Sequence, residues 1–144
     1  MYVDKQLLLS DEQAISASGA NLSTNAIDLW SKAGVVRNAF KGTPLFLVVV
    51  VDVLFAGTGT TMQIRVITAT NNDLTTGQVI LMETPAIAKA SLTAGRTLMV
   101  YALPPLPESG SAQRYLGCDF RTDNTFETTG KVTAFVTSEP QTNV

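Results

Sequence analysis

The sequence predicts an all-β fold, a jelly-roll β-sandwich of about eight antiparallel strands. Turn-forming residues (Gly, Pro, Asn and Asp) recur at near-regular spacing, with short apolar or alternating stretches between them. That pattern is typical of sandwiches and barrels. Threonine, a β-branched residue that favours strands, occurs nineteen times, mostly in the alternating stretches. With 144 residues, 45% of them apolar, the chain has the size and composition of one domain with its own core.

The first 22 residues have weak periodicity, and their second half is small and polar. We therefore expect residues 1–22 to form an extended N-terminal arm that becomes ordered on contact with a partner. Residues 23–144 are expected to form a single jelly-roll domain.

Each expected strand has its own pattern. The apolar stretch at 45–55, interrupted by Asp52, predicts a central strand covered on both faces, whereas 62–66 alternates and predicts one solvated face. Residues 86–94 break strand alternation and predict one helical turn, which Gly95 could end. The predicted strands are 23–29, 45–55, 62–66, 78–83, 97–102, 115–121 and 131–137.

The last strand separates a core face from a polar face. Val132, Ala134 and Val136 point one way, and Phe135 interrupts the polar side. Phe135 is therefore a candidate contact with a partner. The residues expected in the core are Val48, Val50, Ile64, Val66, Leu116, Phe120, Val132 and Val136.

No catalytic or ligand-binding motif stands out, and we expect no enzyme, no cofactor and no metal site. The chain has no histidine, which removes Ser-His and Cys-His catalysis and most zinc sites. Asp119 with Asp123 or Glu127 would be the first carboxylate pair to consider for glycoside hydrolysis. Acids beside a turn usually cap it instead. Cys118 is the only cysteine. Strand alternation places it on the same face as the apolar residues Leu116 and Phe120, so burial is expected.

Charge and hydropathy limit the partners. The net charge is −2 and the ten Lys and Arg are scattered, so we expect no nucleic-acid partner. The longest apolar run, 45–51, is far shorter than the ~20 residues that span a bilayer. Charged residues make up only 15% of the chain, against roughly 25% in an average domain, which suits a surface packed against other proteins. We expect a soluble protein made in a reducing cytoplasm.

Both ends of the chain carry family-like motifs. Residues 4–14 read D-K-Q-L-L-L-S-D-E-Q-A and 23–29 read S-T-N-A-I-D-L; near the other end, 114–117 read R-Y-L-G and 129–136 read T-G-K-V-T-A-F-V. These stretches resemble a family of tailed-bacteriophage capsid cement (decoration) proteins of jelly-roll type, as in Bordetella phage-like podoviruses. The chain departs from the family at Trp30, where members usually have glycine.

The resemblance implies a structural protein on the exterior of a virion, made in the host bacterial cytoplasm. Its partners would be the phage major capsid protein and itself, as a homo-oligomer, with a dimer favoured over a trimer. The candidate interface residues are Asp4, Lys5, Leu7, Leu9, Trp30, Arg114, Tyr115 and Phe135.

Two other functions fit the same fold. A carbohydrate- or receptor-binding module on a virion appendage would use an exposed aromatic platform, for which the candidates are Trp30, Phe40, Tyr101, Tyr115 and Phe126. A small jelly-roll coat protein would usually carry a basic arm, whereas Lys5 is the only positive charge in the expected arm.

Overall fold

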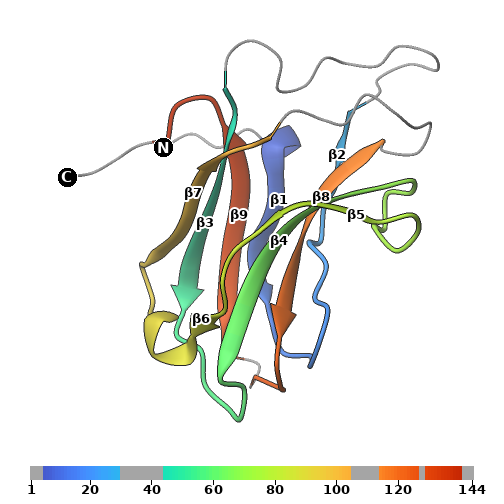
Figure 1. Ribbon diagram of the computed structural model, residues 1–144. Helices are drawn as coiled ribbons and strands as arrows, with labels where there is room; N and C mark the ends of the chain where they lie inside the picture. Colours follow the sequence, from blue (N-terminus) through green and yellow to red (C-terminus); the bar gives the residue numbers. More distant parts are fainter. Residues whose placement is uncertain (1–4, 30–43, 105–113, 127–128, 141–144) are drawn as a thin grey trace.

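The computed structural model describes residues 5–29, 44–104, 114–126 and 129–140. Two antiparallel sheets pack face to face (Figure 1), which confirms the predicted all-β sandwich. Sheet A has the order β1-β9-β3-β7, and sheet B has the order β2-β8-β4-β5, with β6 also paired to β4. The strands are β1 (Leu8–Ala14), β2 (Ile27–Asp28), β3 (Phe46–Val53), β4 (Thr61–Ala69), β5 (Val79–Glu83), β6 (Ile87–Ala88), β7 (Thr97–Ala102), β8 (Tyr115–Thr122) and β9 (Lys131–Thr137).

The strand pairs are nested, which is the topology of a jelly roll. The innermost pair is β4–β5, followed outward by β3–β7, β2–β8 and β1–β9. The chain is thus one long hairpin rolled into two sheets. Because the outer pairs bring together strands that are far apart in sequence, the first and last strands described, β1 and β9, lie side by side in sheet A.

The core lies between the sheets and follows strand alternation. From β3, Leu47, Val49 and Val51 point inward, and they face Ile64 and Val66 of β4. Seven of the eight predicted core residues are buried. The exception is Val50, which is half-buried. Alternation places both Val50 and Val48 on the outer face of sheet A, where Val48 is buried outside the core cluster.

The expected N-terminal arm is wrong for its described part, because residues 8–14 form strand β1 at the edge of sheet A. Leu9 and Ile15 are fully buried in the core. The sequence pattern did not predict this strand because its pairing with β9 has two register shifts and Glu12 adopts a φ of 42°. Such bulges interrupt the alternation by which a strand is identified in sequence.

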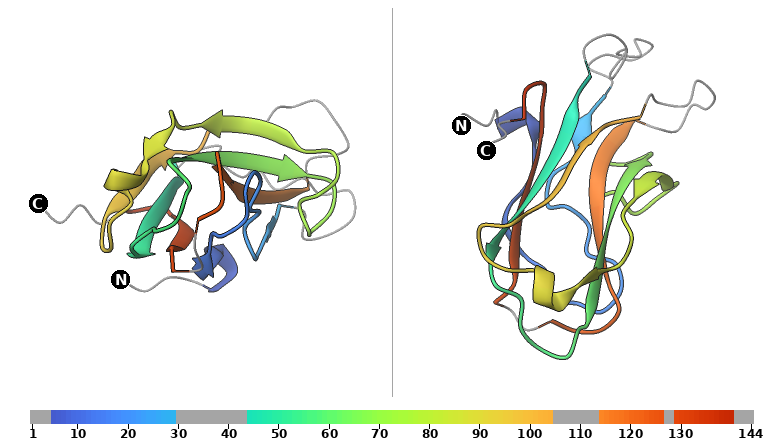
Figure 2. Two further views of the ribbon diagram at one scale, coloured as in Figure 1. Left: turned by 90° about the horizontal axis from the view of Figure 1, so that it is seen from below. Right: turned by 60° about the vertical axis from the view of Figure 1, so that its left-hand side comes forward.

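After β1 the chain crosses to sheet B and runs along the outer edge of β8. Gly19 bridges Thr122, Leu22 bridges Asp119, and β2 then pairs with the start of β8. Residues 8–28 therefore line the edges of both sheets on one side of the sandwich, which we call the closed side. On the other side lie β5, β6 and β7, which we call the open side (Figure 2).

The predicted helical turn is short. Within 86–94 the chain forms the two-residue strand β6 and then a 3-10 turn, η2 (Lys89–Ser91). Gly95 follows with a φ of 79°, a left-handed conformation that glycine adopts at little cost. A second 3-10 turn, η1 (Lys5–Leu7), precedes β1 and contacts β9.

Candidate functional site

Polar side chains fasten residues 19–28 to β8 on the closed side. The backbone amide of Asn21 donates to Asp119 Oδ1 at 3.1 Å, and its side-chain amide donates to the carbonyl of Phe120 at 3.1 Å. The Cys118 amide donates to Ser23 Oγ at 3.0 Å, while the Ser23 amide donates to the Cys118 carbonyl at 2.8 Å. Asp119 is only 2% exposed and also accepts from Arg121 Nε at 3.2 Å. This carboxylate thus has a structural role.

Asp123 caps the turn that precedes β4. Its carboxylate accepts a hydrogen bond from the Thr60 hydroxyl and bonds from the backbone amides of Thr60 and Thr61 at 2.9 and 3.0 Å. These bonds hold the pKa of Asp123 well below its ordinary value, and the bond from the Thr60 hydroxyl has the largest effect. Of the three carboxylates considered for a catalytic pair, Asp119 and Asp123 are thus hydrogen-bonded within the fold. Glu127 lies outside the described residues.

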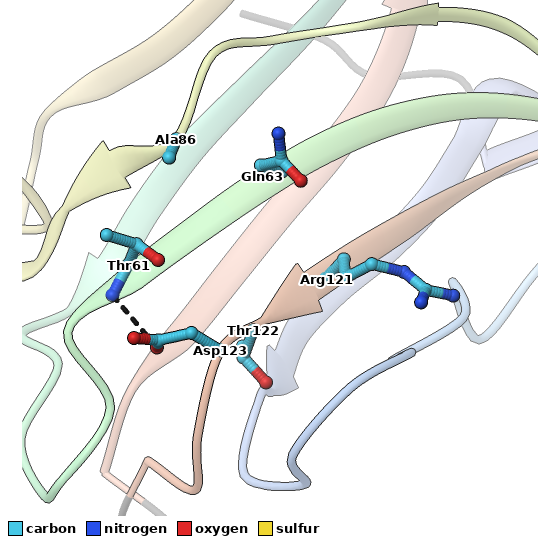
Figure 3. Close-up of a pocket in the computed structure, with 6 residues that line it drawn as sticks. All are labelled: Thr61, Gln63, Ala86, Arg121, Thr122 and Asp123. Carbon is cyan, nitrogen blue, oxygen red and sulfur yellow. Dashed lines mark hydrogen bonds between the residues drawn. The ribbon is translucent and has the colours of Figure 1, made fainter.

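A shallow depression of about 300 Å³ lies beside Asp123, over the ends of β4 and β8 (Figure 3). The Arg121 guanidinium extends away from Asp123 (Figure 3) and is paired with Asp119. None of the lining residues is aromatic, so the depression offers no platform on which a sugar could stack. Its lining residues are Thr61, Gln63, Ala86, Arg121, Thr122 and Asp123.

The proposed aromatic platform does not form from the described aromatics. Phe126 is fully buried and packs edge-on against Phe55, with ring centroids 5.1 Å apart. Tyr101 is exposed on β7, and Tyr115 lies at the start of β8. Trp30 and Phe40 lie outside the described residues.

A charged and aromatic corner, formed by Asp28, Arg114 and Tyr115, lies where β2 meets β8. Arg114 donates to both carboxylate oxygens of Asp28, at 2.9 Å from Nε and 2.7 Å from Nη2. Its guanidinium carbon also lies 5.0 Å from the centroid of the Tyr115 ring. The hydrogen bond to Asp28 raises the pKa of Arg114 above its ordinary value. The pair fixes a partly exposed cation on an aromatic ring, a combination common at protein interfaces.

Sequence reasoning missed Asp28 as a partner of this corner, although the signal was present. Once β2 is aligned antiparallel with β8, Ile27 faces Leu116 and Asp28 faces Tyr115. Cross-strand pairing then places the carboxylate next to Arg114.

The other candidate interface residues divide between surface and core. Lys5 is exposed and Leu7 is half-buried, both in η1. Leu9 and Phe135 are wrong as surface contacts, because Leu9 is in the core and Phe135 is only 3% exposed. Asp4 and Trp30 lie outside the described residues. The η1 turn and the corner at Arg114 lie at the same end of the sandwich (Figure 1).

Phe135 belongs to an apolar row on the outer face of sheet A. Leu8 pairs with Phe135, Phe135 with Val48, and Val48 with Val100, so the row crosses all four strands. Phe135 is on the outer face, as its alternation predicted, but its neighbours bury it.

Fold and surfaces together define a jelly-roll protein whose buried side-chain nitrogen and oxygen atoms, among the residues described, all have hydrogen-bond partners. The family model Bbp16 matches residues 9–136, nearly the full chain. The chain therefore belongs to the Bbp16 family, a Bordetella phage protein family. No curated protein matches it. Within the described residues, no helix is long and apolar enough to cross a membrane.

Proposed function

We propose that this chain is a capsid cement protein that binds the outer surface of a phage head and bridges neighbouring major capsid protein subunits. The observation that carries the proposal is the family match over residues 9–136. It covers most of both terminal motifs that resemble phage cement proteins. A jelly-roll fold is what that resemblance implies, and the sandwich has it.

The mechanism is binding free energy placed at the seams of the shell. When a cement protein binds two neighbouring capsid subunits, the seam between them can open only if the contacts of the cement protein are also broken. Many weak contacts on a closed shell act multivalently, so modest affinity per copy suffices. The sandwich supplies a stiff body for such a bridge, with the first and last strands described, β1 and β9, paired in sheet A.

The corner of Asp28, Arg114 and Tyr115 is the contact surface we favour. An arginine held on a tyrosine ring presents a cation and an aromatic edge with little side-chain entropy left to lose. Arg and Tyr are also the residue types that dominate interface energetics. The η1 turn, which contains Lys5, lies at the same end of the sandwich as the junction of β2 with β8 (Figure 1).

The test is co-sedimentation of the purified protein with heads that lack cement. The wild-type chain should sediment with the heads and raise the temperature at which they open. The double variant Arg114→Ala, Tyr115→Ala should bind at least tenfold more weakly. The matched control is Arg65→Ala, which removes another strand arginine paired with an acid, Glu83, at 2.9 Å, and should bind like the wild type.

Two results separate the claims. If the wild-type chain does not bind heads, the cement function is wrong. If it binds but the double variant binds equally well, the function stands and the corner is not the contact surface.

A further inference from the structure

Strand β7 is an edge strand with backbone groups directed away from the sandwich. It pairs with β3 on one side, and no described strand pairs with it on the other. The Leu103 amide donates to the Leu45 carbonyl at 2.7 Å, so this residue pair is hydrogen-bonded. Since hydrogen-bonded and non-hydrogen-bonded pairs alternate in antiparallel ladders, Val100 and Ala102 direct their N–H and C=O groups to the free edge.

The pairing of β7 with β3 has one register shift, which lies between Thr97 and Met99. From Met99 to Ala102 the pairing is regular, and this part of the edge lacks the features that usually protect one. The six residues of β7 include no charge and no proline. Thr97, Val100, Tyr101 and Ala102 are exposed, with Val100 at 38% and Tyr101 at 54%. Native proteins normally guard a free edge with charges, prolines, bulges or a covering segment, because it otherwise pairs with another strand.

The other two described edge strands of more than two residues, β1 and β5, are guarded. On β1, the Asn25 amide donates to the Leu9 carbonyl at 2.9 Å, so the following segment covers that edge, and two bulges bend it. On β5, a register shift interrupts the pairing, and Glu83 adds a charge. Among the described edge strands of more than two residues, β7 is therefore the one that carries neither a charged residue nor a covering segment.

We propose that β7 pairs with β7 of a second copy, antiparallel across a two-fold axis, to join the two A sheets into one eight-stranded sheet. An extended strand is the occupant that unpaired backbone groups select, and β7 is complementary to itself. A two-fold axis near Val100 or Tyr101 sets the outward groups of Val100 and Ala102 opposite the same groups of the copy.

Charge favours the same occupant. No side chain within β7 repels its copy, and Arg96, which precedes the strand, would lie at opposite ends of the paired ribbon. The exposed Val100 side chains would meet near the axis, so the apolar row on the outer face of sheet A would continue from one copy into the other.

The experiment is sedimentation equilibrium of the full chain over a concentration series that reaches tens of micromolar. The wild type should be a dimer, and Val100→Lys, which sets two cations near the axis, should weaken association at least tenfold. The matched control is Ile80→Lys: Ile80 is 50% exposed on β5, an edge strand of the other sheet, and this variant should dimerise like the wild type.

Two further measurements keep the result decisive. If Val100→Lys does not melt as a folded protein, Tyr101→Lys, at a more exposed position, takes its place. Amide hydrogen exchange of residues 97–102 should slow as the wild type passes from monomer to dimer. A monomeric wild type, a dimeric lysine variant, or exchange in 97–102 that does not depend on concentration would each overturn the proposal. These experiments use no heads, so their outcome is separate from that of the cement function.

Discussion

The closed and open sides of the sandwich solve the same problem, an exposed sheet edge, in different ways. On the closed side, residues 8–28 run along β9 and β8, and polar groups such as Asn21 and Asp119 fasten them there. On the open side, β5 and β7 carry exposed apolar side chains, including Ile80 and Val100.

The difference shows which side of the sandwich has its polar groups paired internally and which side can still bind a partner. Polar groups buried on the closed side have internal partners, and such groups are costly to separate. The open side leaves apolar surface and backbone groups in water, which a partner could remove. Internal stability should therefore depend on the closed side, and association on the open side.

The largest expected effect is at the first strand. Leu9→Ala removes a fully buried side chain from β1 and should lower the free energy of unfolding by about 2–5 kcal/mol. Leu54→Ala makes the same change at a position that is 53% exposed and should cost less than about 0.5 kcal/mol. Urea unfolding of both variants measures the difference. Equal effects would mean that residues 8–14 are not part of the folded sandwich.

The second effect concerns a carboxylate on each side. Asp119→Ala should cost about 1–3 kcal/mol, because the Asn21 amide loses its acceptor in a buried place. Glu83→Ala on β5 removes a solvent-exposed partner of Arg65 and should cost at most about 1 kcal/mol. Thermal and urea denaturation provide both values. A larger loss for Glu83→Ala would reverse the comparison.

The third effect is a pH dependence at Asp123, where the turn before β4 meets the end of β8. Its folded-state pKa is lowered, mainly by the Thr60 hydroxyl, so its stabilisation is present above the unfolded pKa of about 3.9 and is lost as the pH falls through the lower folded value. Asp123→Asn should therefore melt below the wild type at pH 7, and the gap should narrow below about pH 4. A gap that is constant from pH 7 to pH 2 would contradict this assignment.

The smallest expected effect concerns the access of a thiol reagent to buried and exposed cysteines, and it involves no change in stability. Burial raises the pKa of the Cys118 thiol to about 12, so it should resist a thiol reagent at pH 8 until the protein unfolds. A cysteine introduced on the open side, Ile80→Cys, should react within minutes in the folded protein. Rapid labelling of native Cys118 would show that the closed side opens readily.

Sequence patterns predicted the long strands well. The expected strands at 97–102 and 131–137 match β7 and β9, and 115–121 ends one residue before β8 does. Regular alternation or a continuous apolar run specified them, because side-chain direction in a strand has a period of two. Strand β1 was not predicted because its bulges break that period.

The candidate site was harder to predict because exposure depends on neighbours. Alternation placed Phe135 correctly on the outer face of the last strand, but it could not show that Leu8 and Val48 flank the ring. The role of Asp28 depended on the pairing of β2 with β8, which joins segments 86 residues apart. Long-range pairing of this kind is absent from a local pattern.

The position of β9 has a consequence for how the chain is made. This strand comprises residues 131–137 but lies between β1 and β3 inside sheet A, so the sheet is incomplete until these residues have been synthesised. The early strands β1 and β3 therefore lack their shared partner, β9, while more than eighty residues after β3 emerge from the ribosome. Pairing between such distant segments is slow to form. Folding of the sandwich should thus follow the synthesis of residues 131–137, and chains that end before residue 131 should not fold and should be degraded or aggregate.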